Sequence, residues 1–99
     1  MGTLGIALSG IQSAQTRIGV SAHNVANFLT EDFRPQRVVQ TAAPSGGSRA
    51  RVQQSRDPQP VSLEREIVNQ ITAKTAYTAS ARVFAVGAKL EGALLDIFG

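Results

Sequence analysis

Large apolar residues in the first third of the chain recur at alternating steps of four and three. The row consists of Leu4, Leu8, Ile11, Gln15, Ile18, Ala22, Val25 and Leu29, and only Gln15 interrupts its apolar character. This period is typical of a helix that offers a narrow seam to a partner, so we predict a helix over residues 3–29. Gly5, Gly10 and Gly19 each cost a helix interior about 1 kcal/mol relative to Ala, so we expect this helix to order when something packs on it.

A second helix is predicted over residues 62–98. Ser62 is a suitable cap after Pro58 and Pro60, and Glu64 and Glu66 follow in the first turn, where the helix dipole favours acids. The second half of this helix is apolar on more than one face, through Val83, Phe84, Val86, Leu90, Leu94, Leu95, Ile97 and Phe98. One shorter helix cannot cover all of these faces, so we infer burial between molecules.

The connector, residues 30–61, has a different pattern. The short runs 38–41 and 49–53 favour strands, and residues 44–48 between them are turn formers. A small hairpin is predicted there, although a flexible arginine-rich linker fits the composition equally well. The expected fold is one mainly α domain, 1–99, in which two long terminal helices form a coiled-coil-like pair joined by a short β-hairpin or an extended arginine-rich loop.

Composition narrows the function. The chain has no cysteine, which excludes disulfides and thiolate chemistry. The net charge of +3 is concentrated in the connector, in Arg34, Arg37, Arg49, Arg51 and Arg56. Only Phe33 accompanies these arginines, so a stacking platform for nucleic acid is missing and nucleic-acid binding is not expected. The first residues do not read as a signal peptide, and no apolar run is long enough for direct membrane insertion.

Candidate chemistry is sparse. His23 is the only histidine and has no spaced set of further ligands around it, so no metal or other cofactor is expected. Ser21 and His23 are two positions apart and point to different helix faces. They therefore cannot act together as a nucleophile and its general base. Gly46 and Gly47 lack the lysine of a phosphate-binding loop. We therefore predict a protein without catalytic residues.

Both ends of the chain resemble one known family. Residues 7–38 contain Asn24-Val25-Ala26-Asn27, followed by Thr30, Phe33, Arg34 and Arg37. This is similar to the N-terminal motif of flagellar basal-body rod and hook proteins, in which a helix ends in Asn-hydrophobic-Ala-Asn. The family usually has Gly before the aromatic residue, where this chain has Asp32, a residue that tolerates the left-handed conformation better than most.

Residues 61–98 resemble the closing helix of the same family. The similar positions are Leu63, Glu64, Glu66, Val68, Asn69, Ile71, Ala73, Ala76, Tyr77, Ala79, Ala81, Val83, Leu90, Leu94 and Leu95. The short connector makes the chain look most like a small proximal-rod subunit.

The resemblance implies a structural subunit of the flagellar basal-body rod that self-assembles through its terminal helices into a tube and transmits torque to the hook. Its implied partners are further copies, other rod and hook proteins, and the flagellar type III export apparatus, which exports such subunits without a cleaved signal peptide into the periplasm-spanning rod. The expected assembly interface comprises Leu4, Leu8, Ile11, Ile18, Val25, Ile67, Ile71, Tyr77, Phe84, Leu90 and Leu94. Asn24, Asn27 and Asn69 are expected to form turn and inter-helix hydrogen bonds, with Ala26, Thr30 and Phe33 completing the motif.

Two other readings of the sequence stay open. A soluble helical adaptor or export-linked protein would use the same helices on one dedicated partner. A basic nucleic-acid binder would use the connector arginines, with an affinity that falls steeply with salt. The sequence also leaves open whether the two helices pair within one chain or between chains.

Overall fold

The computed structural model describes residues 2–98, and the side chains of residues 2–97; the side chain of Phe98 lies outside this description. The elements are helix α1 (Thr3–Ala26), strand β1 (Gln36–Ala42), strand β2 (Ser48–Gln54) and helix α2 (Leu63–Phe98). The predicted mainly helical chain, with a hairpin between two helices, is confirmed. The connector is not the extended loop that its composition also allowed.

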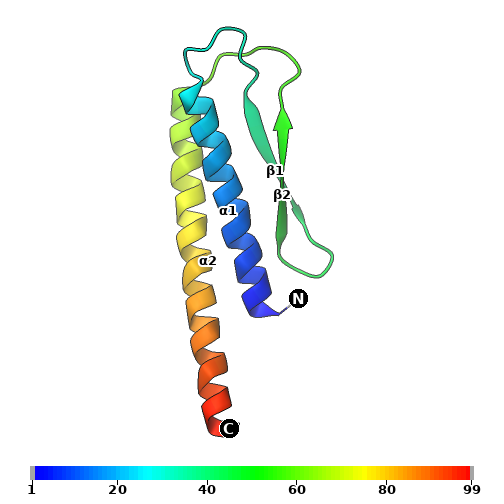
Figure 1. Ribbon diagram of the computed structural model, residues 1–99, viewed down its shortest axis with the longest axis vertical. Helices are drawn as coiled ribbons and strands as arrows, with labels where there is room; N and C mark the ends of the chain where they lie inside the picture. Colours follow the sequence, from blue (N-terminus) through cyan, green and yellow to red (C-terminus); the bar gives the residue numbers. More distant parts are fainter. Residues whose placement is uncertain (1, 99) are drawn as a thin grey trace.

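The elements lie side by side in an elongated molecule with extents of 61 × 24 × 15 Å. Helix α1 runs antiparallel to α2 and lies between α2 and the hairpin (Figure 1). The C-terminal end of α2 extends well beyond the start of α1. Helix α1 is therefore covered on two sides, and the last turns of α2 have no neighbour from the described chain.

The hairpin is antiparallel, with Val38 opposite Val52 and Ala42 opposite Ser48. Its turn closes when the Gly46 amide donates to the Ala43 carbonyl at 3.0 Å. Gly46 and Gly47 then adopt φ of 94° and 83°, values that glycine reaches without a steric cost. The turn lies on α1, because a Cβ built at Gly47 would meet the Oγ of Ser9. Glycine therefore serves both the turn conformation and the close approach.

The end of α1 and the start of α2 both follow from local hydrogen bonds. Helix α1 ends at Ala26, three residues before the predicted end, because the Asn27 amide Nδ2 donates to the His23 carbonyl at 2.9 Å and the chain turns away. Leu29 therefore lies in the turn and not on the helix. Helix α2 starts at Leu63, directly after its predicted cap, where the Arg65 amide donates to Ser62 Oγ at 3.3 Å.

Small side chains form the interior. Among the described residues, the buried apolar ones are Ala7, Ala14, Val20, Val61 and Ala73. Most of the large aliphatic and aromatic side chains of α2 are exposed instead. A chain of this length buries a limited fraction of its surface. The fold therefore leaves a large share of its apolar side chains open to partners.

Candidate interaction surfaces

The two helices pair through small residues spaced seven apart. On α2 these are Ala73, Ser80 and Gly87, and Glu66 stands seven residues before Ala73 on the same face. Ala73 is fully buried. A Cβ added at Gly10 would meet Ser80 Oγ, and one added at Gly87 would lie 2.9 Å from a methyl group of Leu4. The helix axes can approach closely only because these positions carry no larger side chain.

The predicted seam on α1 reaches α2 at Leu4, which lies against Gly87, but it is not the row at the centre of the helix contact. The row that faces α2 lies one position earlier and contains Ala7, Gly10, Ala14, Ser21 and Asn24. One residue is about 100° around a helix, so the predicted seam is turned toward the flank of the helix pair. Its members Leu4, Ile11 and Ile18 are half-buried, whereas Leu8 and Val25 are exposed.

The predicted interface residues of α2 are all exposed; they are Ile67, Ile71, Tyr77, Phe84, Leu90 and Leu94. Tyr77 and Phe84 are seven residues apart. Each comes about one helical turn after a member of the buried row, so both lie close to the face that meets α1. Ile67 and Ile71 lie one turn apart on an outward side. The structure therefore brings none of these six side chains into the interior of the described chain, and their predicted role in assembly stays a prediction.

The last turns of α2 form an overhang, which we define as residues 88–98. Leu4 near the start of α1 contacts Gly87, so α2 continues for about 16 Å beyond this point (Figure 1). The exposed fractions are 60% for Leu90, 53% for Leu94 and 73% for Ile97. The seven-residue spacing of the buried face leads from Gly87 directly to Leu94. The side of α2 that faces α1 therefore continues past α1 as an apolar surface.

A polar node holds α1, β1 and α2 together. Asn24 Nδ2 donates to the Gln36 carbonyl at 2.7 Å and to Glu66 Oε2 at 3.2 Å, and Asn24 Oδ1 accepts from the Gln36 amide at 2.9 Å. Ser21 Oγ adds a hydrogen bond to the Glu66 carbonyl at 3.0 Å. Asn24, for which turn and inter-helix hydrogen bonds were expected, thus bonds to both β1 and α2. Asn69 lines the neighbouring cleft and forms none of the side-chain hydrogen bonds found within residues 2–98.

Glu66 is the member of this node that sequence reasoning missed. Its position in the first turn of α2 predicted an acid that favours the helix dipole, yet Glu66 is buried against α1. The available signal was its spacing, since Glu66 begins the seven-residue series of Ala73, Ser80 and Gly87. In this chain the acid at the head of the row of small residues belongs to the packed face.

The motif after α1 forms a compact turn. Thr30 Oγ1 donates to Asn27 Oδ1 at 3.1 Å, and the Phe33 ring packs on His23 with ring centroids 5.5 Å apart. Asp32 adopts φ of 54°, in line with the left-handed conformation expected where the family has Gly. Ala26, the last residue of α1, is exposed. The side chains of this motif therefore order the turn by contacting one another.

An open polar cleft of about 1040 Å³ lies between α1, the hairpin, the second half of the connector and the start of α2. Arg17, Arg37, Arg56 and Arg65 line it from four different segments. Arg37 donates to the amide oxygen of Gln53 at 3.2 Å. The cleft is wide and carries both charge signs, because Asp57 and Glu66 also line it. It lacks the enclosure of a small-molecule pocket.

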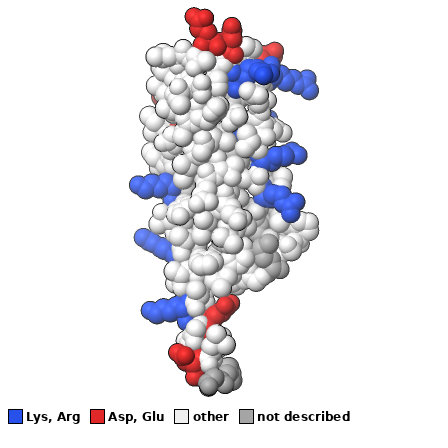
Figure 2. Space-filling view, in the orientation of Figure 1, with Lys and Arg blue, Asp and Glu red and all other residues white. Residues whose placement is uncertain are grey.

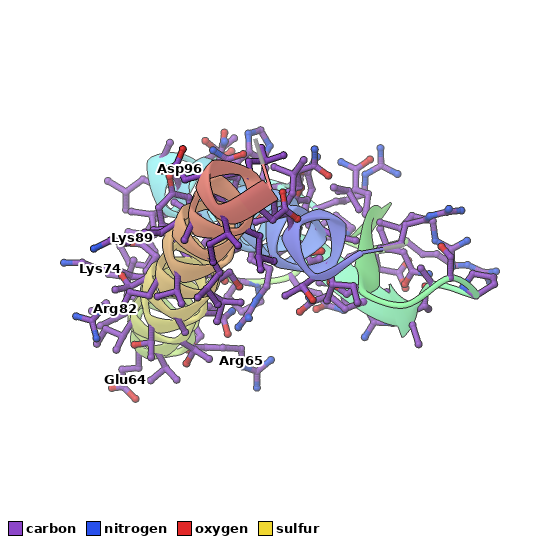
Figure 3. The ribbon with its side chains drawn as sticks, turned by 90° about the horizontal axis from the view of Figure 1, so that it is seen from below. Glu64, Arg65, Lys74, Arg82, Lys89 and Asp96 are labelled. Atoms are coloured by element: carbon purple, nitrogen blue, oxygen red, sulfur yellow. The ribbon has the colours of Figure 1, made fainter. Side chains whose placement is uncertain are left out.

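Charged side chains lie at the margins of the molecule. Figure 2 shows Lys and Arg along both long edges, Asp and Glu near the two ends, and an uncharged strip between them. Lys74, Arg82 and Lys89 project from one side of α2, and Arg65 from a different side (Figure 3). Burying this uncharged strip would not require the desolvation of a charged group.

Potential metal ligands are scattered over residues 2–98. No group of three potential metal ligands occurs in this part of the chain. Ser21 is buried and bonded to α2, whereas His23 is exposed beside Phe33, so the two point apart as predicted. No family model matches the chain, and no curated protein matches it. The unpartnered apolar surfaces are thus the strongest functional feature.

A helix that crosses a membrane needs about 20 consecutive, mainly apolar residues. Neither helix combines the length and the apolar character that crossing a bilayer requires. The apolar overhang alone is shorter than such a span.

Proposed function

We propose that this chain is a structural, non-enzymatic subunit of the bacterial flagellar basal-body rod, and that it assembles with further copies and other rod and hook proteins through its terminal helices. The observation that carries the proposal is the apolar surface that α1 and α2 leave uncovered, from Leu8 and Val25 to Leu90 and Leu94. Exposing such large apolar rows is typical of a surface that meets a partner.

The sequence motifs at both ends support the same proposal. Asn24, Asn27, Thr30 and Phe33 resemble the rod and hook motif, and each has a contact that orders the turn. In the assembled tube, α1 and α2 form a coiled-coil-like pair whose remaining faces meet neighbouring subunits. The subunit is exported through the flagellar type III apparatus and becomes part of the rod that crosses the periplasm.

A motility assay tests this function in the bacterium that encodes the chain. Leu90→Asp places a charge on the exposed overhang without touching the buried row, so the chain keeps its fold but loses its assembly surface. Loss of swimming with a normal level of the protein is expected. Gly92→Ala, which adds no charge to the same overhang, should leave swimming intact. Normal motility of the Leu90→Asp strain would overturn the proposed function.

A helical adaptor for one dedicated partner is the second candidate, and one observation favours it. Within residues 2–97, no buried side-chain nitrogen or oxygen lacks a hydrogen-bond partner. The helix pair is therefore satisfied in a single chain and can persist as a monomer. A stable monomer that forms a 1:1 complex would favour the adaptor over a rod subunit.

A further inference from the structure

Strand β1 has one edge without a strand partner, and this edge borders the polar cleft. The sheet of the described chain has two strands, so each strand pairs on one edge alone. At the open end of the hairpin, the Ser55 amide donates to the Pro35 carbonyl at 2.9 Å, and in an antiparallel pair such bonded positions alternate with unbonded ones. The main-chain groups that point away from β2 therefore belong to Gln36, Val38, Gln40 and Ala42. The first three of these residues line the cleft.

Asn24 already occupies the first position of this edge. Its side-chain amide donates to the Gln36 carbonyl at 2.7 Å and accepts from the Gln36 amide at 2.9 Å. A neighbouring strand makes the same two bonds with its main chain. Within residues 2–97, no side chain continues this pairing at Val38 or Gln40. The edge from Val38 to Ala42 therefore has donors and acceptors for an added strand.

The cleft beside this edge carries more positive than negative charge. Its charged lining residues are Arg17, Arg37, Arg56 and Arg65 against Asp57 and Glu66. Arg37 donates to Gln53, whereas the guanidinium groups of the other three form none of the side-chain hydrogen bonds found within residues 2–97. A guanidinium group matches a carboxylate in geometry and binds it through two parallel hydrogen bonds. The cleft therefore favours a ligand with carboxylates.

The position of Arg65 does not favour its own helix. Arg65 stands in the first turn of α2, where the helix dipole disfavours a positive charge. Its side chain is exposed and projects from a different side of α2 than Lys74, Arg82 and Lys89 (Figure 3). This side faces the cleft. A carboxylate bound there would offset the unfavourable interaction with the dipole.

We propose that the cleft binds an extended, acidic segment of a partner protein, which joins the sheet as a third strand on the free edge of β1. Main-chain bonds to Val38 and Gln40 position the segment, and its carboxylates bind the cleft arginines. Alternate side chains of a strand share one face at a spacing of about 7 Å, so acids at alternate positions all point to the same side. A nucleic acid has the charge but lacks the alternating amide and carbonyl groups that extend a sheet.

A second copy of this chain does not supply such a segment. Acids at alternate positions occur in this sequence only at Glu64 and Glu66. Both belong to α2, and Glu66 is buried. The partner is therefore a different protein. None of the apolar residues predicted for rod assembly lines the cleft, so this contact is tested separately from the proposed function.

Nuclear magnetic resonance of the isotope-labelled full chain at low salt tests the added strand. The probe is a peptide with blocked ends that alternates threonine and glutamate. The amide signals of Val38 and Gln40 should shift and become protected from exchange, whereas the signal of Val52, on the edge of β2, should stay unchanged. The control peptide has the same sequence with N-methylated main-chain amides, and it should bind about tenfold more weakly because it keeps the charge but loses its donors.

Variants of the chain test the same contact from the other side. Gln40→Pro removes an outward amide of β1 without breaking the ladder to β2, and it should weaken binding of the probe about tenfold. Val52→Pro makes the matched change on the edge of β2 and should leave the affinity unchanged. Arg65→Gln should weaken binding about threefold, because it removes one exposed partner of a carboxylate.

Equal binding of the N-methylated peptide would show attraction by charge alone and would overturn the added strand, even where a proline variant fails to fold. Equal affinities of two folded proline variants would also overturn it. The same holds if the unmodified chain does not bind the probe, or if it binds a single-stranded oligonucleotide of equal charge more tightly. Each of these results leaves the motility test of Leu90→Asp, and with it the proposed function, unaffected.

Discussion

The amide of Asn24 donates to the carboxylate of Glu66 at 3.2 Å, although 42 residues separate them in the chain. Both side chains are almost fully buried, and both belong to the face on which the helices meet. Asn24 also exchanges two hydrogen bonds with the main chain of Gln36. One side chain therefore sets the positions of α1, α2 and the hairpin relative to one another.

Replacing Asn24 by Ala should destabilise the monomer strongly. The change leaves the Glu66 carboxylate buried without its amide donor and removes both partners of the Gln36 main chain, which should lower the free energy of unfolding by about 3 kcal/mol. Urea denaturation followed by circular dichroism measures this loss. Asn69→Ala, on the wall of the cleft, is the control and should change stability by less than about 0.5 kcal/mol. Equal effects of the two substitutions would contradict the role given to Asn24.

Replacing Ala73 by Leu tests the close approach of the helices. Ala73 is fully buried in the row of small residues, so a larger side chain must push α1 and α2 apart at a cost of about 1–3 kcal/mol. Thermal denaturation reports the effect. Ala85→Leu changes an exposed position of the same helix and should be close to neutral. If Ala73→Leu is also neutral, the helices do not meet through this row.

Replacing Gly47 by Ala tests the docking of the hairpin turn. The φ of 83° is unfavourable for Ala, and the added methyl group would meet Ser9 Oγ, so stability should fall by about 1–2 kcal/mol. The opposite sign is expected for Gly92→Ala. Gly92 is helical with open space around it, so this change should add up to about 1 kcal/mol. A lower denaturant midpoint for Gly47→Ala and a higher one for Gly92→Ala, both relative to the unmodified chain, would support both assignments. Two lower or two higher midpoints would contradict one of them.

Hydrogen exchange distinguishes the overhang from the rest of α2. In the dilute monomer, the amides of residues 91–98 should exchange much faster than those of residues 70–87, because no other element packs on the overhang. At concentrations that give large species, the overhang amides should become protected. Slow exchange of the overhang in the monomer would show that something within the chain covers it.

The sequence predicted the elements of this fold more accurately than their contacts. Helix boundaries followed from local chemistry, since Ser62 caps α2 and the Asn27 turn ends α1 before Leu29. The hairpin followed from turn formers between two β-compatible runs, and its strands extend a little further than predicted because the ladder continues to Gln36 and Gln54.

The row that joins the helices was harder to predict. Periodicity identifies which residues share a face, but large apolar and small residues both repeat along α1 at the helical period. We predicted that Leu8 and Val25 belong to the helix interface because they are large and apolar. Within the chain, Ala14 and Gly10 meet α2 instead, because their small size lets the backbones approach. A sequence pattern does not say which of two neighbouring faces is used within the chain and which is left for a partner.

The most direct test of the central claim is light scattering combined with circular dichroism on the purified chain over a wide range of concentrations. Our account predicts that large species appear as the concentration rises and that helicity increases with them, because α1 and the overhang of α2 gain neighbours on assembly. A monomer with constant helicity at every concentration would contradict the account and favour an adaptor that binds one dedicated partner.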